Sequence, residues 1–257
     1  CNIVFIGNSI TAGALHEDKN KTAPPVVAAH YVGRMLGADV VFRNCGRSGA
    51  TTLDFIPQQQ RDFTRVEKAI GEIKAISDEP IIFSIMLGTN DSANFGPNGS
   101  PISNEDYKNN LMTMIGRIRE LAPGATFILH RPIWYSPNTH NASQYLVAGQ
   151  KRMEGYTDVL IEMAASNKDI YLGDCDAFDF FSRKYLKYMF AEDGKAGSGQ
   201  KSSGKSGKDL EVEVPIGTVV KRDGEIVADL TFDDPSQRMG QTPIFILQRS
   251  YIPTFLK

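Results

Sequence analysis

Short apolar segments alternate with longer amphipathic segments along the first 190 residues, and this alternation constrains the fold more than any other feature. The apolar, strand-like segments are residues 2–6, 40–42, 81–87, 126–129 and 170–172. The helical patterns between and after them cover about residues 22–36, 61–76, 103–121, 142–165 and 176–190. Strands that alternate with helices form right-handed βαβ units, which build a parallel sheet covered on both faces. We therefore predict an α/β fold for this part of the chain.

The composition is that of an ordinary globular protein. The chain has 257 residues, of which 41% are hydrophobic and 23% charged, and its net charge of −2 gives no sign of a nucleic-acid or membrane partner. No apolar run approaches the roughly 20 residues that a membrane-spanning helix needs. The three cysteines show neither a disulfide framework nor metal-ligand spacing, so no metal site is predicted. Cys1 leads directly into the first strand, and we expect that a preceding segment has been trimmed.

Polar residues follow three of the predicted strands. Ser9 comes after the first strand, Asn90 after the third and His130 after the fourth. The carboxyl ends of parallel strands meet at one edge of the sheet, where ligands bind. A serine there can act as a nucleophile once a base accepts its proton, and the resulting oxyanion needs N–H donors. We predict Ser9 as the nucleophile, with the Gly49 N–H and the Asn90 side chain as donors.

These residues lie in segments that resemble the sequence blocks of the SGNH (GDSL-type) hydrolase superfamily. The matching blocks are Gly-Asn-Ser-Ile at 7–10, Asn-Cys-Gly-Arg-Ser-Gly at 44–49 and Gly-Thr-Asn-Asp at 88–91. The resemblance covers residues 1 to about 190, and Asn8 stands where the family usually has Asp. It implies a flavodoxin-like three-layer α/β/α sandwich with a parallel sheet.

The resemblance also implies a chemistry. Ser9 would be the nucleophile, and the Ser9 N–H, the Gly49 N–H and the Asn90 side chain would form the oxyanion hole. Family members hydrolyse esters, often acetyl groups on carbohydrates, or lipid and thioester substrates, usually without a metal. We therefore expect a small-molecule or carbohydrate ester as substrate and no cofactor. The family also implies export to the periplasm or the cell exterior.

The family's histidine base is missing from its expected place. The last family block, Asp-x-x-His near the C-terminus, has no counterpart because no histidine occurs after His140. The catalytic Asp and His of the family are therefore assigned to no position. His130 follows a strand at the correct edge and is the first candidate for a substitute base, although we predict a packing or substrate-binding role for it. His140, in a loop, is a weaker alternative as the base, while His16 and His30 are expected at the surface or within a helix.

The sequence changes character at about residue 191, which we take as the boundary between a hydrolase-like domain, 1–191, and a segment, 192–257. A stretch rich in Gly, Lys and Ser opens the segment, and residues 209–215 then alternate as in a strand. Two further strand patterns flank the pair Asp223-Gly224, a hairpin signal. From residue 233 onward we assign no regular structure. The segment is predicted to be a small Gly-rich β structure.

Residues 199–206 fit the phosphate-loop pattern, but the strand before it and the helix after it, which such a site requires, are missing from the sequence pattern. Residues 191–235 instead resemble part of the glycine-rich N-terminal domain of Obg-family GTPases, without any of the GTPase domain. The chain is thus interpreted as a chimera of a hydrolase-like domain and a segment similar to part of an Obg-family protein. Its lysines at 195, 201, 205 and 208 are expected in a solvated loop rather than on RNA.

Three functions are compared on this basis. The leading hypothesis is a serine ester hydrolase that deacetylates carbohydrate esters through an acyl-serine intermediate. The alternative is a non-catalytic carbohydrate- or ester-binding protein, or an inactive chimera. A ribosome- or RNA-associated module ranks third.

Overall fold

The computed structural model describes residues 1–136, 145–186, 210–213, 218–222, 225–230 and 244–247. The chain divides into two compact units, Cys1–Leu186 and Lys187–Lys257, and each is described by itself. His140 and the phosphate-loop pattern at 199–206 lie outside the described residues.

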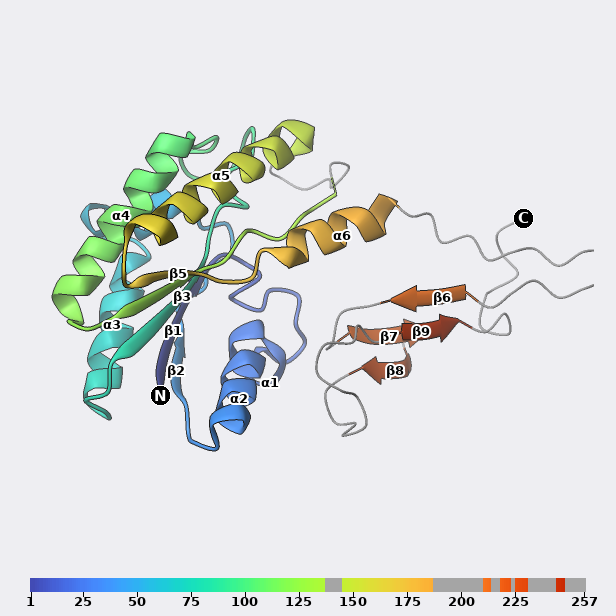
Figure 1. Cartoon of the computed structure of the whole chain (residues 1–257), viewed down its shortest axis with the longest axis horizontal. Coiled ribbons are helices and arrows are strands. Elements are labelled where there is room, and N and C mark those ends of the chain that lie inside the picture. The colour runs from blue at the N-terminus through green and yellow to red at the C-terminus, as the bar shows by residue number, and fades with distance from the viewer. Residues whose placement is uncertain (137–144, 187–209, 214–217, 223–224, 231–243, 248–257) are drawn as a thin grey trace, which may run out of the picture. The chain divides into compact units, whose positions relative to one another are not determined.

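A five-stranded parallel sheet forms the centre of the first unit (Figure 1). Its strand order is β2-β1-β3-β4-β5. The strands are β1 (Asn2–Gly7), β2 (Val41–Asn44), β3 (Ile81–Met86), β4 (Thr126–Leu129) and β5 (Ile170–Leu172). In this register Phe5 lies opposite Asn44 and Gly7 opposite Met86. The predicted α/β fold is confirmed, and all five predicted strands are present.

Helices cover the sheet in separate layers. They are α1 (Lys19–Thr22), α2 (Pro24–Leu36), α3 (Phe63–Lys74), α4 (Asn104–Leu121), α5 (Leu146–Ser166) and α6 (Asp176–Leu186), with 3₁₀ turns η1 (Thr52–Phe55) and η2 (Pro57–Gln59). Figure 1 shows α3, α4 and α5 on one side of the sheet and α2 on the other. The sequence pattern predicted one helix from residue 22 to 36, whereas the structure has α1 and α2, separated before Pro24.

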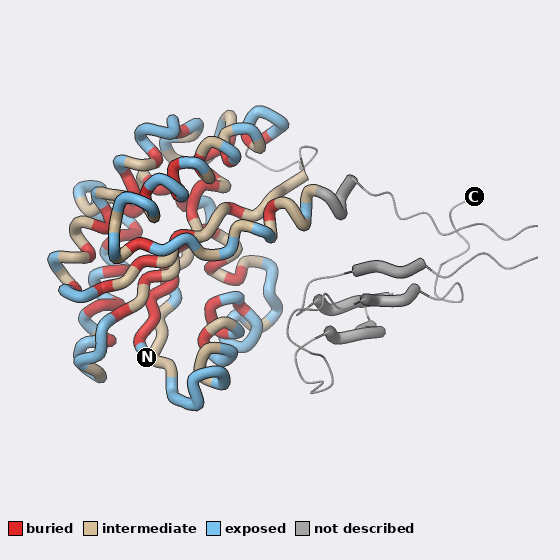
Figure 2. The backbone as a smooth tube through the Cα atoms, in the orientation of Figure 1, coloured by how far each residue is buried: buried red, intermediate tan, exposed pale blue. Residues whose placement is uncertain are grey.

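The main core lies between the sheet and the layer of α3, α4 and α5. Phe83 and Phe127 from neighbouring strands stack there, with ring centroids 5.5 Å apart, and both are fully buried. On the opposite face a smaller cluster packs Ile3 and Phe5 of β1 against Ala29 of α2. Figure 2 shows the buried residues concentrated along the strands and on the inner sides of the helices. This apolar packing holds the ends of the strands in place.

Local signals set several helix ends. Ser103 caps α4, because its Oγ accepts a hydrogen bond from the Asp106 N–H at 3.0 Å. Gly37 ends α2 in the left-handed conformation.

The described residues of the second unit form two antiparallel strand pairs. β7 (Thr218–Arg222) pairs with β8 (Glu225–Leu230), as the hairpin signal predicted, although the turn at 223–224 lies outside the described residues. β6 (Leu210–Glu213) pairs with β9 (Ile244–Leu247), a strand to which the sequence pattern gave no assignment. Within the described ranges, no helix of either unit is long and apolar enough to cross a bilayer.

Candidate active site

The predicted site residues lie on three loops that follow β1, β2 and β3. β1 lies between the other two strands in the sheet, so their carboxyl ends are neighbours. Two hydrogen bonds join the first loop to the second: the Arg47 N–H donates to the Gly7 carbonyl at 3.0 Å, and Asn44 Nδ2 donates to the Thr11 carbonyl at 2.8 Å. The loops that carry Ser9 and Gly49 are therefore held side by side.

Ser9 lies in a tight turn directly after β1. The side-chain Oδ1 of buried Asn8 accepts a hydrogen bond from the Ile10 N–H at 3.0 Å, and the Ser9 carbonyl accepts one from the Ala14 N–H at 2.9 Å. Gly7 permits this turn because a Cβ there would come within 2.0 Å of Thr11 Oγ1. The turn leaves Ser9 partly exposed at the edge of the sheet.

Gly49 is required by its backbone conformation rather than by lack of space. Its φ is +79°, in the left-handed region that favours glycine, and a Cβ built there meets nothing within 4 Å. Neither the Ser9 N–H nor the Gly49 N–H donates a hydrogen bond to another described residue.

Asn90 presents its amide in one defined orientation. Its Nδ2 donates to the Ala50 carbonyl at 2.8 Å, and its Oδ1 accepts a hydrogen bond from the Tyr145 hydroxyl at 2.7 Å. The side chain is only 4% exposed. The bond to Ala50 brings the Asn90 amide next to the Gly49 loop. The contact from Tyr145, 55 residues away, carried no signal in the sequence.

The neighbouring Asp91 ties the same two loops together from inside the protein. Its Oδ1 accepts hydrogen bonds from the Thr52 N–H at 2.8 Å and from Thr52 Oγ1 at 2.5 Å. Asn110 Nδ2 completes the network by donating to Thr52 Oγ1 at 3.0 Å. Asp91 is fully buried, and its Oδ2 has no hydrogen-bond partner among the described residues. Burial raises the pKa of this carboxyl from 3.8 to about 6.

Arg47 anchors the second loop to the body of the domain. Its guanidinium forms ion pairs with Asp62 and, at 3.2 Å, with the fully buried Asp54. Arg61 also pairs with Asp54, at 2.9 Å. Two cations thus neutralise the buried carboxylate, and Arg47 fixes the loop that ends at Gly49.

Comparison with protein families decides the assignment of this domain. The model described as the GDSL-like lipase/acylhydrolase family matches residues 5–194, which is more than half of the chain. The chain belongs to this family. The match includes all three loops of the site and confirms the resemblance of the sequence blocks. The domain of this GDSL-like protein is thus that of a lipase/acylhydrolase.

The C-terminal part of the GDSL-like chain is similar to a different family. The model described as GTP1/OBG matches residues 171–240 and overlaps the first match at 171–194. The GTPase Obg of Persephonella marina is 52% identical over 52 residues, which are 20% of this chain and 15% of the relative. The GTPase Obg of Aquifex aeolicus is 49% identical over 49 residues, 18% of this chain and 14% of the relative. The chain therefore spans only a small part of these GTPases.

Solved structures with similar backbones include several hydrolases. An alpha/beta hydrolase enzyme from the metagenome of Lake Arreo, Spain, has 24% identity and a TM-score of 0.49, over 74% of this chain and 84% of that one. A lipase/acylhydrolase from Enterococcus faecalis has 22% identity and a TM-score of 0.48, over 71% and 78%. A mutant acetylxylan esterase from Geobacillus stearothermophilus has 21% identity and a TM-score of 0.47, over 73% and 81%.

His130 of the GDSL-like domain is bonded within the protein at both ring nitrogens. Nδ1 accepts a hydrogen bond from the Asp174 N–H at 3.2 Å, so Nε2 carries the proton and donates to Ser84 Oγ at 2.9 Å. Burial lowers the pKa of His130 below its ordinary value. Gly173 lies so close that a Cβ there would come within 2.4 Å of Nδ1. These contacts favour the packing role over substrate binding.

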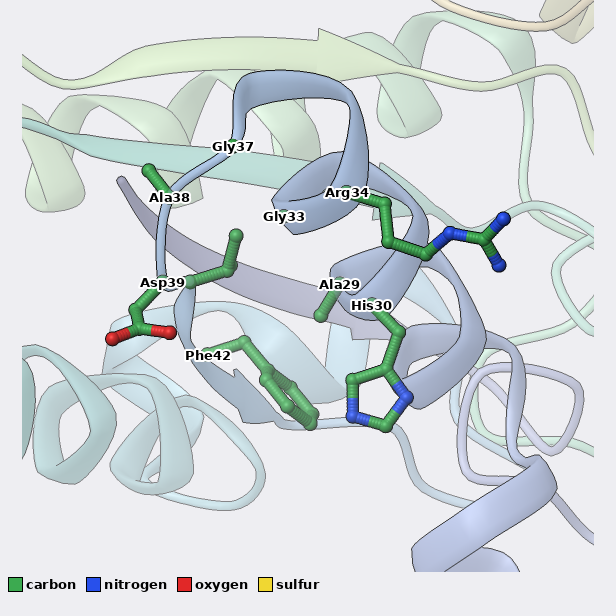
Figure 3. Close-up of a pocket in the computed structure, with 9 residues that line it drawn as sticks. Ala29, His30, Gly33, Arg34, Gly37, Ala38, Asp39 and Phe42 are labelled. Atoms are coloured by element: carbon green, nitrogen blue, oxygen red, sulfur yellow. The ribbon is translucent and has the colours of Figure 1, made fainter.

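The remaining described histidines lie on the surface near the N-terminal helices. His16 Nδ1 is 3.0 Å from Thr22 Oγ1. His30 lies on α2 beside a hollow formed with the chain that leads into β2 (Figure 3). This hollow lies at the amino end of β2, whereas Ser9 lies beyond the carboxyl end of β1, so the two are at opposite ends of the parallel strands. Within residues 1–136 and 145–186, no hydrogen bond joins Ser9 to a histidine, and no cluster of side chains suited to a metal ion occurs.

Proposed function

We propose that this chain is a serine ester hydrolase that reacts through an acyl-Ser9 intermediate. Ser9 Oγ attacks the ester carbonyl carbon, the C–O bond to the alcohol breaks, and the alcohol leaves with the proton that Ser9 gives up. Water then attacks the acyl-enzyme, which releases the carboxylic acid and returns a proton to Ser9 Oγ. The Ser9 N–H, the Gly49 N–H and Asn90 Nδ2 would stabilise the oxyanion in both steps. The observation that supports the proposal is the hydrogen bond from Asn90 Nδ2 to the Ala50 carbonyl, which holds the Asn90 amide next to the loop that carries Gly49.

The serine proton still needs an acceptor. No described histidine is bonded to Ser9, and the ring of His130 is engaged by Ser84 and Asp174. Other serine hydrolases without a complete triad retain about 10³- to 10⁴-fold catalysis over water from the oxyanion hole and binding. We therefore expect a slow, Ser9-dependent reaction.

For the substrate we propose an acetyl ester of a carbohydrate. The support is the resemblance of the three sequence blocks to a family that often removes acetyl groups from carbohydrates. The acetylxylan esterase among the structural neighbours acts on a substrate of this kind.

The second candidate function is a non-catalytic protein that binds carbohydrate esters. It is favoured by one observation, that Ser9 has no hydrogen bond to a histidine in the part of the chain that the structure describes. Such a protein would bind the ester in the same three loops without cleaving it.

Hydrolysis of p-nitrophenyl acetate distinguishes the ester hydrolase from the non-catalytic binding protein. The purified chain is compared with Ser9→Ala, which removes the nucleophile, and with His130→Gln, which keeps a polar side chain at the packing site. We expect the reaction to depend on Ser9 and to survive in His130→Gln. Equal rates for the wild type and Ser9→Ala would contradict the hydrolase proposal and favour the binding protein.

A further inference from the structure

We infer that Tyr145 is a positioning residue for the oxyanion hole, and that its hydroxyl orients and polarises the Asn90 amide. The inference rests on the proposed function, because it concerns the same Asn90 donor. It assigns a role to a residue outside the three sequence blocks of the family.

The Asn90 amide is held between a hydrogen-bond acceptor, the Ala50 carbonyl, and a hydrogen-bond donor, the Tyr145 hydroxyl. The Ala50 carbonyl can only accept, so Nδ2 must face it, and the 2.8 Å bond shows that it does. Oδ1 then faces the Tyr145 hydroxyl, which donates to it at 2.7 Å. One of the two N–H groups on Nδ2 is used by Ala50, and the other is left for the oxyanion.

The Tyr145 bond also makes that remaining N–H a stronger donor. A donor on the amide oxygen draws electron density away from the nitrogen, and chained hydrogen bonds in a low-dielectric site strengthen one another by about 10–30% each. Asn90 is 4% exposed and Tyr145 9% exposed, so water screens this chain only weakly. The hydrogen bond from this N–H gains more strength from the polarisation when its acceptor is an oxyanion than when it is the neutral carbonyl of the substrate. The Tyr145 hydroxyl therefore stabilises the transition state more than the bound substrate.

The fold holds Tyr145 ready for this role. It lies immediately before α5, and its carbonyl accepts a hydrogen bond from the Gly149 N–H at 3.0 Å. Its ring packs against Tyr135, with centroids 4.9 Å apart. The Tyr135 hydroxyl lies 3.0 Å from Ser92 Oγ, a different partner. Tyr145 is therefore placed by packing before any substrate arrives.

The test replaces Tyr145 by Phe, with Tyr135→Phe as the matched control. Both variants lose one hydroxyl and keep the ring, but only Tyr145→Phe loses the bond to Asn90. We expect the Ser9-dependent kcat to fall about tenfold, less than the 10²- to 10³-fold cost of losing an oxyanion donor, with KM nearly unchanged. Fluorotyrosine at position 145, a more acidic donor, should restore or exceed the wild-type kcat. A kcat equal to that of the control, or no gain from fluorotyrosine over Phe, would overturn the inference.

A spectroscopic readout separates this inference from the proposed function. In ¹H–¹⁵N spectra, the Asn90 side-chain amide should shift upfield in Tyr145→Phe and stay unchanged in Tyr135→Phe. If the wild type hydrolyses no faster than Ser9→Ala, the hydrolase proposal fails and the amide shift alone decides the positioning role. An Asn90 amide that is unmoved in Tyr145→Phe overturns that role whatever the activity.

Discussion

Replacing Asp91 by Asn should change how the stability of the protein depends on pH. Asp91 is fully buried, and its Oδ1 accepts two hydrogen bonds from Thr52 while Oδ2 has no partner among the described residues. Burial without a counter-charge favours the protonated carboxyl. An Asn side chain has nearly the same shape and keeps the Oδ1 acceptor for Thr52, but it carries no charge at any pH. The substitution therefore isolates the effect of ionisation.

The magnitude follows from the pKa of Asp91. Folding raises it from 3.8 to about 6, because the buried site disfavours the charge. At about 1.4 kcal/mol for each tenfold change in the protonation constant, this corresponds to about 3 kcal/mol. The folded state binds more protons than the unfolded state in this range, so this stabilising contribution is complete below pH 3.8 and is lost as the pH rises through about 6. In Asp91→Asn this contribution is absent.

Urea unfolding of both proteins at about pH 4 and about pH 8 measures the effect. Because pH 4 already lies just above the unfolded pKa of 3.8, the free energy of unfolding of Asp91→Asn, relative to the wild type, should increase by about 2.5 kcal/mol between these two values. Other carboxylates titrate in both proteins and cancel in the difference. The Asn Nδ2 lacks an acceptor and adds a cost of about 1–3 kcal/mol that does not depend on pH. A difference that is constant within about 0.5 kcal/mol would refute the reasoning.

Three further predictions concern the site loops and the core. Gly49→Ala should lower the free energy of unfolding by about 1–2 kcal/mol and also lower the Ser9-dependent rate of hydrolysis. Gly37→Ala, at a similar positive φ at the end of α2, is the control and should lower the free energy of unfolding equally without loss of rate. Arg47→Met should lower the free energy of unfolding by about 3 kcal/mol, because the buried carboxylates of Asp54 and Asp62 lose a cationic partner. Arg61 is more exposed, so Arg61→Met should lower it by only about 1 kcal/mol. Equal losses in the two variants would contradict this. Burial raises the pKa of Cys45 to about 12, so iodoacetamide at pH 8 should modify this thiol only after unfolding, as mass spectrometry would show.

The sheet and the three loops could be predicted because their signals are local. Each buried strand is a short apolar run, and its end is marked by glycine or a polar residue, as at Ser9 and Asn90. The parallel order then places these ends at one edge. The reason for glycine at position 49 could not be predicted, because a sequence shows that glycine is present but does not show that its φ is positive.

The supporting contacts of the site could not be predicted, because they join residues far apart in the chain. Tyr145 bonds to Asn90 across 55 positions, and Asp91 bonds to Thr52 across 39. A tyrosine near the start of a helix and an aspartate after a strand have many possible partners. The contacts of His130 likewise depend on Ser84 and on the chain after β5, which only the folded sheet brings together.

The most direct test of the account is covalent labelling of Ser9. A fluorophosphonate probe loses fluoride when an activated serine oxygen attacks its phosphorus, and peptide mass spectrometry locates the adduct. The account predicts one dominant adduct on Ser9, slower labelling in Asn90→Ala because an oxyanion donor is lost, and no labelling at this position in Ser9→Ala. An unlabelled Ser9, or labelling spread evenly over exposed serines, would contradict the claim that these three loops form a serine hydrolase site.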